Sequence, residues 1–240
     1  MKKIAKHAIL ACASGIFLVI SGCATGPQAN PRDPLEPLNR TVYGFNEVVD
    51  NAVLKPVATV YTKVTPALVR TGVTNFFSNL TEVWSTANNA LQFKGREAVE
   101  SWMRFSINTV FGLGGIFDLA TDMGLERHKE DFGQTLGSWG VPSGPYLVLP
   151  LLGSSTVRDT AALPLDMQGN ALNAVPHSGD RDRLTGLNLV NTRANLLRAS
   201  AVLDDAALDK YTFSRDFYLQ ARRSEVYDGN PPEPAAEPAK

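Results

Sequence analysis

FGQTLGSWGVPSGPYLVLPLLGSSTV, residues 132–157, is a run of twenty-six residues without a charged side chain. A transmembrane helix needs ~20 apolar residues, so length alone would allow a membrane span. Five glycines and three prolines interrupt the run, however, and forbid continuous helical hydrogen bonding. Irregular backbone at membrane depth is tolerated only where it packs inside protein or lines a cavity. We therefore expect this segment to be internal to a body that sits partly within one leaflet. An ordinary buried loop with a core strand is the alternative.

The segments on either side have the apolar periodicity of helices rather than strands. The sequence contains no alternating strand pattern of useful length and no internal repeat. We therefore predict an all-α fold class. Four helical segments are indicated, at residues 38–49, 99–110, 184–201 and 203–223.

Three glycines follow the second of these segments, within the uncharged run 105–117. Gly112, Gly114 and Gly115 each cost a helix ~1 kcal/mol relative to alanine, so we expect them to break or bend an apolar helix. They lack the G-x-G-x-x-G spacing and a preceding strand. They therefore do not indicate a dinucleotide-binding loop.

The N-terminus has the pattern of a secretory signal. Three lysines among the first six residues precede an uncharged, largely apolar stretch, 8–20, which is too short to span a bilayer as a helix. The segment ends in Ile-Ser-Gly-Cys, residues 20–23, which resembles the lipobox at which bacteria lipidate the cysteine and cleave just before it. Acyl chains on Cys23 would attach the body stably to a membrane. Because Ala24 follows, rather than aspartate, the outer membrane is favoured. An uncleaved anchor helix and an ordinary secreted protein are the alternatives.

The chain is expected to divide into four parts. Residues 1–22 form the cleaved signal peptide, and 23–32 hold the lipidated cysteine and a small, polar, proline-bearing tether. The helical domain spans residues 33–229. Residues 230–240 contain four prolines and no large apolar residue, which is typical of a disordered tail.

Cysteine content and net charge narrow the interpretation further. Cys12 is lost with the signal and Cys23 carries the lipid, so the mature body has no disulfide and depends on burial for its stability. Without the three signal lysines the chain keeps 20 basic and 24 acidic residues, a formal charge of −4. This balance argues against a nucleic-acid-binding surface.

Few residues could titrate or attack a substrate. The mature chain has two histidines, His128 and His177, and no thiol free of lipid. Ser138 and Ser143 lie in glycine-rich segments that come near the serine-hydrolase elbow but place the serine wrongly for a strand-to-helix turn. His128 stands beside three carboxylates that could help it to ligate a metal, although a solvated charged turn explains the same residues more simply. We predict no catalytic residue, no metal site and no cofactor.

Several motifs together resemble the MlaA (VacJ) family of outer-membrane lipoproteins. They are Asp33–Arg40, Tyr43–Asn46, Gly112–Asp118, Glu130–Gly137, Trp139–Val141, Gly144–Pro150, Ser155–Asp159 and Tyr211–Asp216. The resemblance covers residues 31–229, and many motifs in fixed order are more specific than any one of them. Ser154 stands where the family often has proline, a departure that concerns local loop geometry.

This resemblance implies a compact, helical, ring-like protein embedded in the inner leaflet of the outer membrane, with an amphipathic central channel. It implies that phospholipid mislocalised in the outer leaflet is removed and passed to a soluble periplasmic lipid carrier, which maintains lipid asymmetry. Trimeric outer-membrane porins are implied as further partners. A structural envelope lipoprotein that scaffolds porins or other proteins is the main alternative, and a phospholipase is less favoured.

Candidate lipid-channel or gating residues come from the same motifs: Gly112, Gly114, Gly115, Tyr146, Arg158 and Asp159. Arg158 and Asp159 come directly after the uncharged run, where apolar and polar linings would meet. An arginine at this place could hold a lipid phosphate by charge-assisted hydrogen bonds. A structural ion pair with a neighbouring carboxylate is the alternative role for Arg158.

Overall fold

The computed structural model describes residues 30–233. The predicted signal peptide, Cys23, the tether up to residue 29 and tail residues 234–240 lie outside the described residues. In chain order the elements are α2 (Glu36–Val49), η1 (Asp50–Leu54), α3 (Lys55–Val64), α4 (Ala67–Leu91), α5 (Gly95–Val110), α6 (Leu119–Asp122), α7 (Phe132–Ser138), β1 (Tyr146–Leu149), β2 (Gly153–Thr156), α8 (Val157–Gln168), η2 (Ala171–Ala174), α9 (Ser178–Ala206) and α10 (Lys210–Val226).

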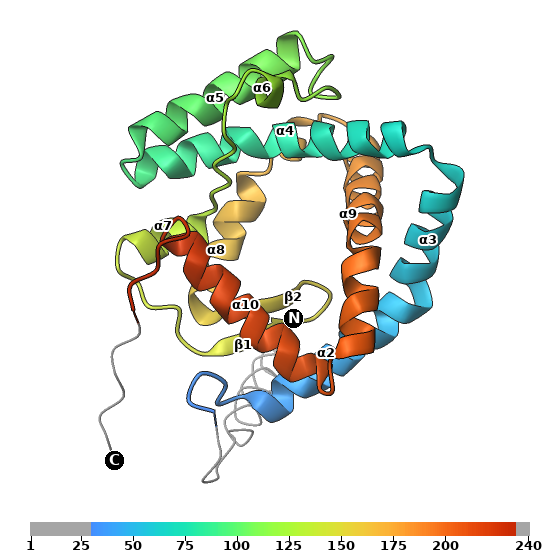
Figure 1. Ribbon diagram of the computed structural model, residues 1–240, viewed down its shortest axis with the longest axis vertical. Coiled ribbons are helices and arrows are strands. Elements are labelled where there is room, and N and C mark those ends of the chain that lie inside the picture. The colour runs from blue at the N-terminus through green and yellow to red at the C-terminus, as the bar shows by residue number, and fades with distance from the viewer. Residues whose placement is uncertain (1–29, 234–240) are drawn as a thin grey trace, which may run out of the picture.

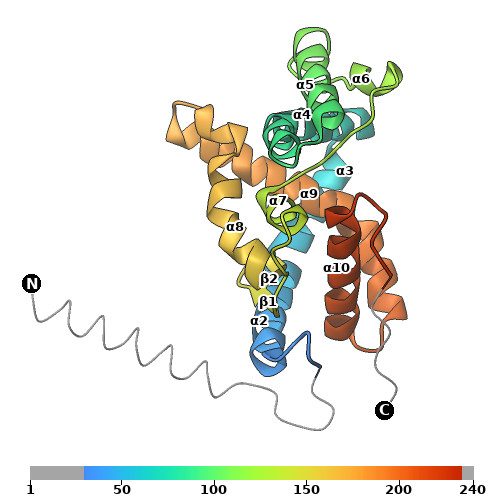
Figure 2. The ribbon, with the colours of Figure 1, turned by 90° about the vertical axis from the view of Figure 1, so that its left-hand side faces the viewer.

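The helices are arranged around a ring (Figure 1). α4 crosses one end with α5 packed along it, and α3 and α9 run side by side along one flank. α2 and the β1–β2 hairpin lie at the opposite end. Figure 2 shows α8 and α10 on opposite faces, with α7 and the hairpin between them. The predicted all-α class and ring-like body are confirmed.

The uncharged run 132–157 is more regular than we expected. It contains α7 and then β1 and β2, which pair antiparallel with Tyr146 opposite Thr156 and Leu149 opposite Gly153. Both strands are only four residues long, and no alternating apolar pattern marks them. We expected an irregular segment here, with a buried loop and core strand as the alternative, and the sequence pattern did not indicate the hairpin.

One helix prediction also needs correction, and one long helix was not predicted. The segment 203–223 is not one helix, because α9 extends to Ala206 and α10 begins at Lys210. Asp209 caps α10, its carboxylate accepting from the backbone N–H groups of Tyr211 and Thr212, which fixes the break. The long helix α4 had no predicted counterpart, since its buried face is largely polar.

Burial in this body is the reverse of that in a water-soluble bundle. Among residues 30–233, 35 large hydrophobic side chains are exposed, whereas 11 hydrophobic and 19 polar or charged residues are buried. Helix α5 illustrates the pattern, because its apolar stripe of Val99, Trp102 and Met103 is exposed while Ser101 and Arg104 are buried. None of the helices within residues 30–233 is long and apolar enough to cross a membrane.

Candidate functional site

A polar groove lies between α4 and α9, with a volume of about 360 Å³. Its lining comes from α4, from the segment between α6 and α7, and from α9: Thr74, Phe77, Ser78, Thr81, Arg127, Lys129, Asn188, Asn191, Thr192, Asn195 and Leu196. Amide and hydroxyl side chains predominate, and the two cations stand on one segment. Such a lining suits a polar or charged ligand group.

A second cavity of about 190 Å³ adjoins the polar groove. The two share Phe77, Thr81, Lys129 and Asn188, so they meet along α4 and α9. The second cavity also contains Trp84 and the carboxyl groups of Glu130, Asp131 and Asp166. Cationic and anionic groups therefore line two adjoining cavities.

Two apolar pockets adjoin the polar groove. One, of about 570 Å³, is lined by Phe76, Phe77, Ile116, Phe117, Leu184, Leu187 and neighbouring residues. The other, of about 540 Å³, lies between α9 and α10 and includes Leu196, Leu203, Phe213 and Phe217. Phe77 belongs to the first pocket and the groove, and Leu196 to the second pocket and the groove. The four cavities together form an amphipathic set of adjoining spaces.

Buried ion pairs between α4 and α5 support one side of the groove. Arg104 is 1% exposed and donates to Glu82 Oε1 at 3.1 Å, to both oxygens of Asp118 and to the carbonyl of Leu125. Asn108 also donates to Asp118 at 2.9 Å. Burial raises the pKa of Glu82, although hydrogen bonds and charge from its arginine neighbours act against this shift. These contacts fasten the start of the 125–131 segment to the helices.

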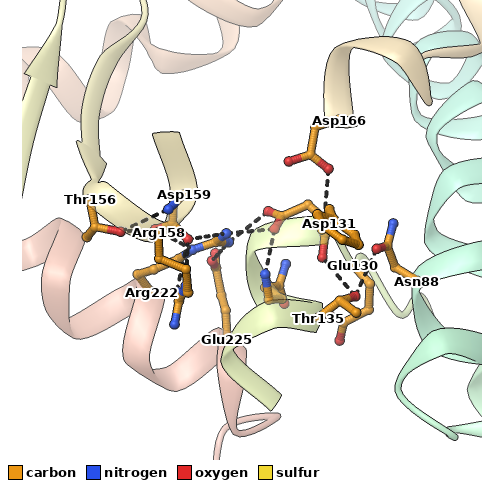
Figure 3. A network of polar contacts seen from close by, with 12 residues as sticks. Asn88, Glu130, Asp131, Thr135, Thr156, Arg158, Asp159, Asp166, Arg222 and Glu225 are labelled. Carbon is orange, nitrogen blue, oxygen red and sulfur yellow. Dashed lines mark hydrogen bonds and ion pairs between the residues drawn. The ribbon is translucent and has the colours of Figure 1, made fainter. Parts of the chain in front are cut away.

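A second buried network joins α7, α8 and α10 (Figure 3). Arg222 donates to Asp131 at 2.6 and 2.7 Å and to Asp159 at 3.1 Å, while Arg158 donates to Asp159 at 2.9 and 3.0 Å. Tyr218 donates to Asp159 at 2.9 Å. Burial alone would raise the pKa of Asp159, but the contacts with Arg222 and Arg158 lower it. A carboxylate held this way stays ionised and ties three helices together.

A third network joins the beginning of the described chain to its last helix. Asp33 is fully buried, accepts a short hydrogen bond from Tyr211 and accepts another from Asn39 at 2.8 Å. Arg215 lies 3.3 Å from the same carboxylate. Asn39 also donates to the carbonyl of Tyr146, so α2, β1 and α10 meet here.

The structure divides the six predicted channel residues between two regions. Gly112, Gly114 and Gly115 end α5, with φ of +70° and +94° at the latter two, so the helix stops rather than bends. Gly115 packs so closely on α4 that a Cβ would lie 2.6 Å from Asn79. Helix termination there is confirmed, whereas a role in lipid passage stays a prediction.

Tyr146, Arg158 and Asp159 lie in the second region. Tyr146 is fully buried and packs edge-on to Tyr211, with its hydroxyl 2.8 Å from Ser154 Oγ. Arg158 and Asp159 belong to the Arg222 network. None of the six predicted residues is among those lining the four cavities. The structure therefore places Arg158 in the ion pair that was its alternative role.

Sequence reasoning overlooked the residues that line the polar groove. Arg127 and Lys129 flank His128 in a segment that reads as a solvated charged turn. Asn188, Asn191 and Asn195 recur at helical spacing, which was the available signal for a polar face on α9. This polar face lies beside the apolar residues of α9 whose spacing predicted a helix at 184–201.

The histidine flagged as a conceivable metal ligand has another contact. His128 Nε2 lies 2.6 Å from Glu100 Oε2, between the 125–131 segment and α5. Within residues 30–233 there is no group of three or more His, Cys, Asp or Glu side chains that could hold a metal ion.

Comparisons with known proteins give a consistent result. The family model described as "MlaA lipoprotein" matches residues 31–225. The "Intermembrane phospholipid transport system lipoprotein MlaA" of Escherichia coli K12 is 35% identical over an alignment of 241 residues, covering 97% of this chain and 94% of that protein. The protein of the same description from Haemophilus influenzae is 32% identical, with 88% of each chain covered. A solved structure described as "Structural basis for maintenance of bacterial outer membrane lipid asymmetry" matches with a TM-score of 0.71 and 34% identity, covering 82% of this chain and 99% of that one.

Proposed function

The chain belongs to the MlaA lipoprotein family, and we propose that it removes mislocalised phospholipid from the outer leaflet of the outer membrane and passes it to a periplasmic lipid carrier. The lipid would move through the connected cavities between α4, α9 and α10. This activity maintains outer-membrane lipid asymmetry without chemical conversion of the lipid. The relatives described as lipoproteins of an intermembrane phospholipid transport system support the assignment.

Inverted burial is the observation that carries the proposal. The 35 exposed large hydrophobic side chains would be costly in water, at roughly 25 cal/mol per Å² of apolar area, but not against lipid tails. Buried polar groups, by contrast, lie in the networks that join the helices, such as Arg104 with Glu82 and Arg222 with Asp159. A body built in this way suits one leaflet of a bilayer, with acyl chains outside and a polar passage within.

The cavities match the two halves of a phospholipid. The two apolar pockets, of about 570 and 540 Å³, can take acyl chains, and the polar groove between them can take the headgroup. Cys23, lipidated, would hold the protein at the inner leaflet on the periplasmic face. We include a trimeric porin and a soluble lipid carrier as partners, on the family resemblance.

A gene-deletion experiment tests the proposal. Cells that lack the protein should accumulate phospholipid in the outer leaflet, and expression of the wild-type chain should restore the normal level. Unchanged outer-leaflet phospholipid in the deletion strain would refute the transport role.

The alternatives predict different results. A scaffold should keep working when a bulky side chain obstructs the polar groove, as in Ser78→Trp, whereas a transporter should lose lipid removal while remaining in the membrane.

A phospholipase should release fatty acid and leave lysophospholipid, and Ser138→Ala or His128→Ala should stop that release. We expect no release from the wild-type protein.

A further inference from the structure

The segment 125–130 is hydrogen-bonded along α4. The carbonyl of His128 accepts from Asn89 at 3.1 Å, and the backbone N–H of Glu130 donates to Ser85 at 3.2 Å. Arg104 binds the carbonyl of Leu125 at 2.6 Å. The buried polar groups of α4 and α5 thus fix the backbone of a segment that has no helix or strand of its own.

Fixing this backbone places two cations at the polar groove. Arg127 lies 3.0 Å from Glu82 Oε1, so its charge is compensated, yet its side chain is 37% exposed. Lys129 is exposed and makes no ion pair within residues 30–233, although it lines both the groove and the adjoining cavity. Lys129 is therefore the uncompensated positive charge of this space.

The remaining lining supplies neutral hydrogen-bonding groups. Asn191 is 2% exposed and donates to Thr74, and Asn195 donates to the same hydroxyl at 3.0 Å. Both side chains are held by these bonds in the wall of the groove. The exposed Asn195 amide is therefore oriented before a ligand reaches the groove, which lowers the entropic cost of binding.

A carboxyl group without an ion-pair partner among the described residues lies in the adjoining cavity. Of the carboxyl groups that line it, Glu130 is paired with Lys94 and Asp131 with Arg222. Asp166 makes no ion pair within residues 30–233, although the charge of Arg222 acts on it at longer range. Its Oδ1 accepts from Trp84 Nε1 and from the backbone of Phe132, both at 2.8 Å.

The free oxygen of Asp166 is the one that a ligand could use. Its Oδ2 has no partner among the described residues. Burial raises the pKa of Asp166, although its two hydrogen bonds and the charge of Arg222 act against this shift, so a nearby cation would stabilise the ionised form. A ligand ammonium would supply the missing charge.

We propose that the polar groove and the adjoining cavity form a subsite for a zwitterionic phospholipid headgroup, with the phosphate against Lys129 and an ammonium against Asp166. Lys129 and Asp166 are opposite in sign, make no ion pair within residues 30–233 and line adjoining cavities, which matches a headgroup that carries both charges. The proposal rests on the phospholipid-transport function and adds a headgroup preference to it.

Binding of tail-labelled fluorescent lipids to the full lipidated chain in dodecyl maltoside micelles tests the subsite. The probes are phosphatidylethanolamine, phosphatidylglycerol and diacylglycerol. Lys129→Gln should weaken the binding of both phospholipids roughly tenfold, because one charge-assisted hydrogen bond is lost. The binding of diacylglycerol should not change. Asp166→Asn keeps the oxygen that accepts from Trp84. It should weaken the binding of phosphatidylethanolamine alone, and so lower the affinity for this lipid relative to phosphatidylglycerol.

The matched control is Lys63→Gln, which removes an exposed lysine on α3 that also makes no ion pair within the described part of the chain. It should bind all three probes like the wild type, and all three variants should show wild-type thermal unfolding. Unchanged phospholipid binding by Lys129→Gln, or an unchanged ethanolamine-to-glycerol ratio for Asp166→Asn, would overturn the proposal. Complete displacement of phospholipid by inorganic phosphate would likewise overturn it, by identifying a free-phosphate site.

The outcomes separate this subsite from the transport role. If Lys129→Gln and Asp166→Asn bind both phospholipids as tightly as the wild type does, and deletion still raises outer-leaflet phospholipid, the subsite is refuted and transport stands. If the wild type shows no preference for phospholipid over diacylglycerol and deletion leaves the outer leaflet normal, both are refuted.

Discussion

Arg222 is the residue whose contacts connect the most segments in the second buried network. Its side chain is 10% exposed and lies within 3.1 Å of Asp131, Asp159 and Glu225. Removing one partner of a buried ion pair costs more than the pair contributes, because the remaining charge stays buried.

We expect Arg222→Ala to lower the free energy of unfolding by about 3–5 kcal/mol, since it leaves Asp131 and Asp159 without their shared partner. Urea unfolding of the purified chain in detergent measures this. Arg183→Ala is the control, because Arg183 is 84% exposed in its pair with Asp180, and it should change stability by less than about 0.5 kcal/mol. Equal losses for the two variants would contradict a structural role for the network.

The same network predicts a pH dependence. The pKa of Asp159 is lower in the folded chain than the ~3.9 of an unfolded aspartate. A carboxyl group shifted in this direction stabilises the fold above the unfolded pKa and loses its contribution as pH falls through the folded pKa. Unfolding free energy should therefore fall below about pH 4.

The fall should be smaller in Asp159→Asn, which should also be less stable than the wild type at neutral pH. Asp180→Asn, at an exposed site, should keep the wild-type profile. Unfolding in urea at a series of pH values checks both, and a full-sized fall in Asp159→Asn would assign the acid sensitivity to other carboxyl groups.

For individual residues, the sequence singled out Arg158 and Asp159 but did not show which residues contact them. Their place after the uncharged run was evident, and an ion pair was one of the two roles considered. Arg222, 63 residues beyond Asp159, reaches the same carboxylate from α10, because α10 packs on α7 and β2, which also contact α8. No local sequence pattern records this long-range contact.

Among the elements, periodicity identified helices better than it identified their faces. The stripe of Val99, Trp102 and Met103 correctly predicts α5, yet these residues are exposed and the polar face is buried. Periodicity shows that two faces differ, but it cannot say which one faces protein when the surroundings are themselves apolar. For the same reason periodicity did not predict α4, because its buried face carries polar residues such as Asn79 and Glu82.

The end of α5 gives a prediction that separates two neighbouring glycines. Gly115 has φ +94° and a Cβ there would lie 2.6 Å from Asn79, whereas Gly114 has φ +70° and open space around it. Gly114→Ala should therefore cost about 1 kcal/mol, for the left-handed backbone alone.

Gly115→Ala should cost more than Gly114→Ala, because Asn79 or the backbone must also move. Gly114→Asn is the control, since asparagine adopts the left-handed conformation more readily than alanine, and it should approach wild-type stability. Thermal unfolding ranks the three variants. If Gly115→Ala proved the most stable of them, the close approach to α4 would be wrong.

For the whole molecule, the class and the ring were predictable and the polar groove was not. Motif order across residues 31–229 implied the ring, whereas the groove is assembled from α4, the 125–131 segment and α9. Thr74 and Asn191 are 117 residues apart in the chain yet hydrogen-bonded at 2.9 Å. A site built from such distant pieces becomes visible only once the helices are placed.

The exposed apolar surface gives the prediction that concerns the whole body. Val57 and Val60 are 46% and 58% exposed on α3, so they contribute little to the core. A charged side chain in the hydrocarbon costs roughly 2.5–3.5 kcal/mol at the centre of a spanning helix. The lipidated Val57→Asp/Val60→Asp variant should therefore fold normally in detergent and stay anchored through Cys23, while its body sits less deeply in the leaflet.

Quenching by brominated phospholipids measures this depth, because Trp102 and Trp139 are 53% and 51% exposed and should contact lipid in the wild type. The double aspartate variant should lose much of the quenching and, in cells, accumulate phospholipid in the outer leaflet. Val57→Leu/Val60→Leu keeps the surface apolar at the same positions and should match the wild type in both measurements. If the aspartate variant kept full quenching and full lipid removal, the apolar face of α3 would not lie in the membrane, and the inverted burial of this body would need another explanation.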